Sequence, residues 1–208
     1  MIKRSRGIAD GMSKGVAFLM KKNKIDIIDG FGKIKTGKKV DVTAEDEKVT
    51  EYSADSIIIA TGSRSRELPN LPQDGVKVIE YRKAMILPSQ PKSMIVIGSV
   101  AIGVEFAHFY STLGTDVTIV EFLPNLVPVE DIDVSKQFER SFKKAGIKVM
   151  TNSSVEPVDT SGEGFVATVK TKKDEIKLEA DILLSAVGIK SNIESIGLED
   201  VGIIVDRD

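Results

Sequence analysis

The sequence predicts an α/β fold with a Rossmann-like dinucleotide-binding domain, a β-meander and part of a second nucleotide-binding domain. A β-branched run, Met94–Ile97, leads into a glycine turn and a helix. A second apolar strand, Asp116–Val120, ends at the acidic Glu121. Strand, turn, helix and strand in this order make a βαβ unit. Two further apolar segments end at Gly62 and Gly188. Each follows a run of strand-like sequence, and the two segments are weakly similar to each other in sequence.

The first third of the chain predicts a helix followed by short strands. Residues Lys14–Lys24 are rich in valine, phenylalanine, leucine, methionine and lysine, as an amphipathic helix can be. Ile25–Ile28 is a strand-like run that leads into the glycine-rich turn Asp29–Lys33. Three hairpin-like segments then follow, at 39–44, 48–52 and 56–62, and a proline-bearing connector covers 68–91.

The glycine turn after Met94–Ile97 matches the dinucleotide-binding fingerprint at two of its three glycines. Gly98 and Gly103 stand at the first and third positions, and Val100 stands at the second. The second glycine normally allows the backbone to approach a pyrophosphate without an intervening Cβ. The sequence therefore predicts a dinucleotide site in which Val100 weakens the affinity. If that position required a positive φ, valine would also add backbone strain.

The residues after the turn predict a helix from Ala101 onward, with its amide groups and positive dipole end facing a phosphate. An apolar stripe recurs at helical spacing, and Gly114 is placed to end the helix. The stripe consists of Ile102, Phe106, Phe109 and Leu113.

Glu121 indicates which dinucleotide the site prefers. It follows Gly98 by 23 residues, where a carboxylate can accept a hydrogen bond from an adenosine ribose. The same carboxylate would repel a 2′-phosphate, and the segment 122–124 supplies no cation to bind one. NAD is therefore favoured over NADP.

The remainder of the chain predicts the second half of the domain. A proline-marked loop follows Phe122, and Gly146 is expected to end the next helix. We expect that helix and four strands at 134–145, 147–150, 165–170, 175–178 and 182–188.

Composition narrows the function classes. With 208 residues, 41% of them hydrophobic, the chain can bury a core, and its net charge of −2 points to neither nucleic acid nor an anionic membrane. The absence of cysteine excludes thiol chemistry by these residues and suits a cytoplasmic setting. The single histidine, His108, is expected on a helix surface, and no metal site is expected.

Four sequence blocks together resemble the middle of the flavin-dependent pyridine nucleotide-disulfide oxidoreductases, and among them the dihydrolipoamide dehydrogenases. The similarity extends through Asn192–Gly202 and covers essentially the whole chain. The blocks are Gly7–Val16 with Lys21–Lys24, Ile58–Ser63, Ile97–Phe106 and Ala180–Gly188.

The resemblance implies three regions and two cofactors. Residues 1–90 would be the C-terminal part of an FAD-binding domain with a connector, 91–190 an NAD-binding domain, and 191–208 a return segment. The implied NAD contacts are Gly98, Ser99, Val100, Ala101, Ile102, Gly103, Glu105, Glu121, Val155 and Gly188, with Glu105 near the nicotinamide. The implied FAD contacts are Gly30, Gly32, Thr61, Gly62 and Ser63. Val155 fits a simple strand-core residue equally well.

The resemblance also implies a parent reaction, in which dihydrolipoamide is oxidised through a cysteine pair and FAD to give NADH. The parent would be a homodimer that acts with lipoyl domains of 2-oxo acid dehydrogenase complexes. A C-x-x-x-x-C pair and a catalytic His-Glu pair are not among these residues, so the chain is expected to be an inactive central fragment. The alternatives are a mercuric or glutathione reductase type of enzyme, a non-catalytic nucleotide-binding module, and a protein without nucleotide function.

Overall fold

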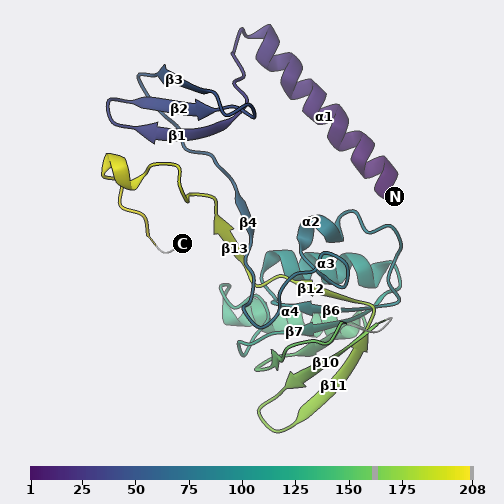
Figure 1. The fold of residues 1–208 in the computed structure, drawn as a ribbon. Coiled ribbons are helices and arrows are strands. Elements are labelled where there is room, and N and C mark those ends of the chain that lie inside the picture. Colours follow the sequence, from purple (N-terminus) through teal and green to yellow (C-terminus); the bar gives the residue numbers. More distant parts are fainter. Residues whose placement is uncertain (161–163, 207–208) are drawn as a thin grey trace. The chain divides into compact units, whose positions relative to one another are not determined.

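A computed structural model describes residues 1–160 and 164–206 and divides the chain into two units (Figure 1). Unit 1 comprises Met1–Arg64 and Lys190–Asp208, and unit 2 comprises Ser65–Ile189. Residues 207–208, at the end of the predicted return segment, lie outside the described part.

Unit 2 is built on a five-stranded parallel sheet in the order β5-β12-β6-β7-β8. The run Met94–Ile97 lies in the central strand of this sheet. Its side chains are buried on both faces, because another layer of the unit covers each face of the sheet. The strands are β5 (Val78–Ile79), β6 (Ser93–Ile97), β7 (Asp116–Val120), β8 (Lys148–Met150) and β12 (Ile182–Ser185).

Different layers cover the two faces of this sheet (Figure 1). Three helices pack on one face, with Ala84, Val104, Tyr110 and Phe142 in the shared core. They are α2 (Tyr81–Ala84), α3 (Ala101–Thr112) and α4 (Ile132–Lys144). A three-stranded antiparallel meander packs on the other face. It consists of β9 (Ser154–Val155), β10 (Phe165–Lys170) and β11 (Glu175–Ala180).

Most of the predicted elements of unit 2 are confirmed. Gly114 (φ +97°) and Gly146 (φ +88°) follow the ends of α3 and α4 in the left-handed conformation that glycine tolerates. Helix α4 begins two residues earlier than the predicted Val134, because the side chain of Asp131 caps it by accepting from Asp133 N at 2.8 Å. The predicted connector also contains β5 and α2, which are too short for a periodicity to show.

The predicted stripe of α3 is half wrong. Ile102 and Phe106 pack against the core, but Phe109 and Leu113 are exposed. The buried residues of this helix are Gly103, Val104, Ala107 and Tyr110. Gly103 and Ala107 were not predicted as core positions, because the hydrophobicity of a residue does not show how closely its helix approaches the sheet.

Unit 1 contains a long helix and a small antiparallel sheet. The helix α1 covers Ile2–Lys22 and begins twelve residues before the predicted Lys14. The glycines at 7, 11 and 15 lower helix propensity and hid its first turns. The sheet has the order β1-β2-β3, and its two later strands match the predicted hairpin segments. They are β1 (Phe31–Lys35), β2 (Lys39–Thr43) and β3 (Val49–Ser53).

Two predicted strands of unit 1 are absent from the described residues. Ile25–Ile28 and 56–62 form no ladder, although both are rich in isoleucine. Their side chains are largely exposed, with Ile58 at 90%, and the same holds for 203–205. A β-branched run becomes a strand only beside a partner backbone, and the described part of unit 1 offers none to these segments.

The C-terminal segment of unit 1 packs against β1. Ile34 N donates to Ile196 O at 2.7 Å, and Ile196 and Leu198 are buried. A Cβ on Gly197 (φ +84°) would lie 2.2 Å from Ile34 O, so only glycine fits there. The short helix η1 (Glu199–Val201) follows.

The strands β4 (Ser63–Ser65) and β13 (Ile189–Ser191) pair with each other, and in them the chain passes from one unit to the other. No helix in the described ranges has both the length and the apolar character needed to span a membrane.

Candidate dinucleotide-binding site

The site lies where strands β6, β7 and β12 of unit 2 end. The chain runs from β6 through α3 to β7 on one side, and β12 lies on the other side of β6. This reversal of strand order is a topological switch point, and ligands of open parallel sheets bind outside the carboxyl ends of the strands there. Gly98, which follows β6, and 186–188, which follow β12, both lie at this edge.

Gly98 makes the sharp turn out of β6 that the fingerprint predicts. Its φ is +92°, and its amide donates to Val120 O at 3.0 Å. A Cβ here would lie 2.4 Å from Ala186 O, so a side chain would collide with the backbone that follows β12. Ala186 N in turn donates to Ile97 O at 2.8 Å. The two backbone segments therefore approach each other as closely as they do only because residue 98 is glycine.

Gly103 allows helix α3 to lie directly on this turn. A Cβ at Gly103 would be 2.0 Å from Gly98 O, a distance that no side chain could occupy. The third glycine of the fingerprint thus has the packing role that the sequence pattern indicates.

Val100, at the second position, is accommodated without backbone strain. It is the N-cap of α3 with φ −78° and ψ −179°, an extended conformation that valine adopts readily. The expectation of strain, which depended on a positive φ, is therefore wrong. Its side chain is 43% exposed at the mouth of the turn. The helix has no side-chain cap and no acidic residue in its first turn, so its first amides are open to an anion.

Glu121 is buried and bound to the turn. Its Oε2 accepts from Ser99 N at 2.8 Å and from Ser99 Oγ at 2.6 Å, and its Oε1 accepts from Leu123 N at 2.8 Å. Glu121 is 6% exposed and Ser99 is fully buried. These contacts connect the carboxyl ends of β6 and β7 through one carboxylate. The spacing of 23 residues revealed the acid but gave no sign of its bond to Ser99.

The other predicted residues of α3 lie near the same end of the helix. Ala101 and Glu105 are exposed, whereas Ile102 packs against the core. His108 is also exposed, with its ring 6.3 Å from that of Phe142, so it lies on the helix surface as expected.

Val155 and Gly188 lie on the meander side and at the end of β12, respectively. Val155 pairs with Val169 and is 7% exposed within the core under the meander, which gives it a packing role. Gly188 has φ +107°, and its carbonyl accepts from Arg66 N at 3.0 Å. Its backbone lies three residues beyond the end of β12.

The five residues predicted to contact FAD all belong to unit 1. Gly30 (φ +149°) is required by close packing, because a Cβ would lie 2.6 Å from Thr43 O. Gly32 lies in β1 and Ser63 in β4. The carbonyls of Thr61 and Gly62 accept from the side chain and backbone amide of Asn192, at 3.2 and 3.0 Å.

A charged cluster that the sequence did not reveal lies beside this segment. Arg64 donates to Glu194 through both terminal nitrogens, at 2.6 and 3.1 Å, and to Asn192 Oδ1 at 2.8 Å. The hydrogen bonds from Arg64, followed by that from Lys190, hold the pKa of Glu194 well below its usual range. A separation of 130 residues between the partners left no local signal.

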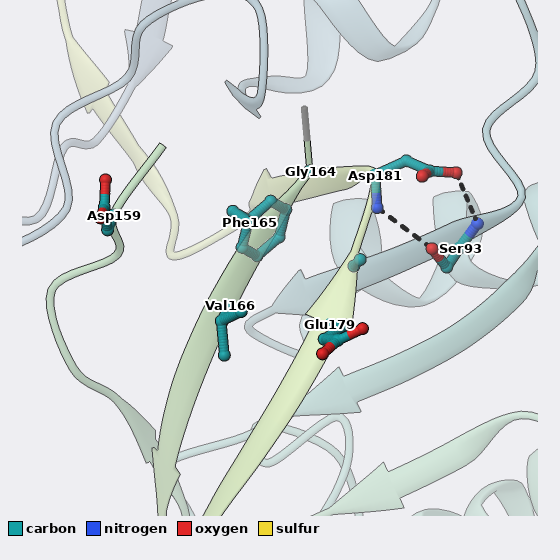
Figure 2. A pocket seen from close by; sticks show the side chains of 8 residues that line it. Ser93, Asp159, Gly164, Phe165, Val166, Glu179 and Asp181 are labelled. Atoms are coloured by element: carbon teal, nitrogen blue, oxygen red, sulfur yellow. Dashed lines mark hydrogen bonds between the residues drawn. The ribbon is translucent and has the colours of Figure 1, made fainter. Parts of the chain in front are cut away.

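A hollow lies at the opposite end of β6 from the glycine turn (Figure 2). It has a volume of about 690 Å³ and is lined by Glu179, Phe165 and the pair Ser93 and Asp181. Ser93 N donates to Asp181 Oδ2 at 3.2 Å, and Asp181 N donates to Ser93 Oγ at 3.1 Å. Since Ser93 begins β6 and the glycine turn follows its end, this hollow is separate from the switch point. Within the described ranges, no three His, Asp or Glu side chains are grouped to hold a metal ion.

Comparison with known proteins gives consistent matches. The family described as pyridine nucleotide-disulphide oxidoreductase matches residues 3–208. A dihydrolipoyl dehydrogenase of Zymomonas mobilis is 40% identical over all of this chain and 45% of its own length. LpdA from Mycobacterium tuberculosis superposes with a TM-score of 0.88 at 29% identity, covering 99% of this chain and 46% of its own. The HOCl-induced flavoprotein disulfide reductase RclA from Escherichia coli superposes with a TM-score of 0.83 at 25% identity, and the match covers 99% of this chain and 46% of RclA. The chain spans less than half the length of these proteins.

Proposed function

The chain belongs to the pyridine nucleotide-disulphide oxidoreductase family, and we propose that it forms the NAD-binding part of a flavin-dependent dihydrolipoyl dehydrogenase. The whole enzyme would oxidise dihydrolipoamide to lipoamide and transfer the electrons through a redox disulfide and FAD to NAD+. The observation that carries the nucleotide assignment is the buried Glu121 carboxylate beside the Gly98 turn, at the switch point of the sheet. The 40% identity to a dihydrolipoyl dehydrogenase supports the choice of reaction.

The residues present fit a dinucleotide at this edge. The turn from Gly98 to Gly103 and the open amides of α3 would hold the pyrophosphate, and Glu121 would accept from the adenosine ribose. Glu105 would orient the nicotinamide near Gly188, and Val155 would border the adenine. NAD+ supplies the hydride acceptor, and the protein supplies its position and the surrounding charges. Val100 is the one departure, because its side chain occupies the place where the fingerprint has none.

The FAD contacts and the domain assignment belong to the same proposal. Residues 1–90 would complete an FAD-binding domain with contacts at Gly30, Gly32 and 61–63, 91–190 would bind NAD, and 191–208 would return to the FAD domain. The division into units at 189–190 supports the second boundary, whereas the division at 64–65 puts the connector from residue 65 to 90 in the same unit as the NAD-binding residues. The parent would be a cytoplasmic homodimer that serves lipoyl domains of a 2-oxo acid dehydrogenase complex.

Calorimetric titration with NAD+ and NADP+ tests the nucleotide assignment. The Glu121 carboxylate should disfavour a 2′-phosphate by about 1–3 kcal/mol, so NAD+ should bind more tightly. The variant Glu121→Gln, which removes the charge and keeps the shape, should reduce this preference. Equal or tighter binding of NADP+ by the unchanged chain would rule out the assignment.

A disulfide reductase of another specificity is the second candidate, favoured by the similarity to RclA. Such an enzyme would share the NAD site and differ in its disulfide substrate. Steady-state assays on the full-length parent with dihydrolipoamide and with other thiols or disulfides would distinguish the two. Activity only with a non-lipoyl substrate would replace the first candidate with the second.

A further inference from the structure

We propose that Ser99 is a specificity-determining residue of the nucleotide site, because its hydroxyl limits Glu121 to a single hydrogen bond with the adenosine ribose. The inference rests on the proposed function and deepens it. Ser99 lies between the first and second glycine positions of the fingerprint, where the pattern allows any side chain.

The side chain of Ser99 turns inward. It is fully buried, and its three polar groups are all occupied. Its amide and hydroxyl donate to Glu121 Oε2 at 2.8 and 2.6 Å, and its carbonyl accepts from Val127 N at 3.1 Å. The backbone of the turn is therefore held on both sides of the residue, independently of the hydroxyl.

The acceptor positions of Glu121 can be counted. A carboxylate offers about four lone-pair sites, two on each oxygen. Ser99 fills both sites of Oε2, and Leu123 N fills one site of Oε1. One acceptor position remains, on Oε1.

This count limits how a ribose can bind. An adenosine ribose presents adjacent 2′- and 3′-hydroxyls, and an unencumbered carboxylate could accept from both. With Ser99 in place, Glu121 can accept from only one of them, expected to be the 2′-hydroxyl. The second bond would require the Ser99 hydroxyl to leave a buried position in which it has no other described acceptor. Ser99 thus acts on the ribose through Glu121, without touching the nucleotide by its side chain.

Removing the hydroxyl should open the second position. In Ser99→Ala the backbone bonds to Glu121 and Val127 remain, and Oε2 regains one free site. The 3′-hydroxyl should then contribute to binding, which it does not in the unchanged chain. Ser99→Gly provides a second variant in case alanine disturbs the turn. Ser135→Ala is the matched control, because it removes another buried serine hydroxyl of unit 2, which donates to Val127 O rather than to Glu121.

The experiment is calorimetric titration of the 208-residue chain and its variants with NAD+ and with its 2′-deoxyadenosine and 3′-deoxyadenosine forms. Circular dichroism first establishes that each variant is folded. In the unchanged chain and in Ser135→Ala, loss of one hydroxyl should weaken binding about tenfold, as a bond to a charged acceptor does, and loss of the other by less than about twofold. In Ser99→Ala and Ser99→Gly, loss of either hydroxyl should weaken binding by at least about fivefold.

Two results would overturn the inference while leaving NAD binding intact. One is equal sensitivity to both hydroxyls in the unchanged chain, and the other is an unaltered asymmetry in both Ser99 variants. Should Val100 make the affinity too weak to measure, the series is run in the Val100→Gly background. Failure of the chain to bind NAD+ in either background would instead overturn the proposed function, and the inference with it.

Discussion

Val100 occupies the second fingerprint position with an extended backbone and 43% of its surface exposed. Since the fold tolerates this conformation, any penalty falls on the ligand, whose pyrophosphate must avoid a β-branched side chain. We expect Val100→Gly to tighten NAD+ binding by about tenfold or more, or at least about 1.4 kcal/mol. Titration of both proteins at one salt concentration measures this. Val76→Gly, which removes another exposed valine of unit 2, is the control. Unchanged affinity in Val100→Gly would show that the turn accommodates valine.

Ser185 is an unusual polar residue in the core of unit 2. It ends β12 and is 1% exposed, and its hydroxyl has no hydrogen-bond partner among the described residues. A buried hydroxyl without a partner destabilises the folded state. Ser185→Ala should therefore leave the free energy of unfolding unchanged or raise it by about 1 kcal/mol.

Urea denaturation of the 208-residue chain provides the measurement. The control is Ser135→Ala, whose hydroxyl donates to Val127 O at 3.2 Å and whose loss should cost about 1 kcal/mol. A loss of stability in Ser185→Ala as large as that in the control would mean that Ser185 has a partner, such as a bound water.

Helices α1 and α3 both contain glycine, and the structure assigns these glycines opposite roles. In α3, a Cβ at Gly103 would lie 2.0 Å from Gly98 O, whereas a Cβ at Gly11 in α1 would have no neighbour within 4 Å. Gly103→Ala should push α3 off the turn and destabilise unit 2 by about 1–3 kcal/mol. Gly11→Ala should stabilise α1 by about 0.5–1 kcal/mol. Thermal unfolding followed by circular dichroism tests both changes, and equal effects would contradict the packing role of Gly103.

How well an element could be predicted depended on where its partners lie in the sequence. The βαβ unit around Gly98 was predictable because strand, turn and helix are adjacent in sequence, and Gly103 packs on Gly98 only five residues before it. The close approach of Gly98 to Ala186, 88 residues away, left no local signal. Ile25–Ile28 looked equally strand-like, but its state depends on a partner backbone that local sequence does not report. The Ser99–Glu121 bond and the Arg64–Glu194 pair join distant residues and likewise left no pattern. Local sequence therefore predicted the elements whose partners are adjacent in the chain, and tertiary packing determined the remaining elements and which side chains meet.

The whole chain should be unable to carry out the parent reaction alone. Its sequence contains one dinucleotide fingerprint and no cysteine, so these residues supply neither a second pyrophosphate turn for FAD nor a redox disulfide. The purified chain should be colourless, without flavin absorbance near about 450 nm, and inactive with dihydrolipoamide and NAD+. Spectroscopy and a steady-state assay test this, with the Zymomonas mobilis dihydrolipoyl dehydrogenase as the positive control. A yellow preparation with stoichiometric FAD would contradict it.

The isoleucine-rich segments of unit 1 should make the purified chain prone to self-association. Ile25–Ile28, 56–62 and 203–205 expose apolar side chains and form no β-ladder among the described residues. Short, weakly charged β-branched segments of this kind are templates for intermolecular strand pairing. With a net charge of only −2, mutual repulsion between molecules is weak. Colloidal stability, rather than unfolding, should therefore set the highest concentration and the storage time at which the chain can be handled.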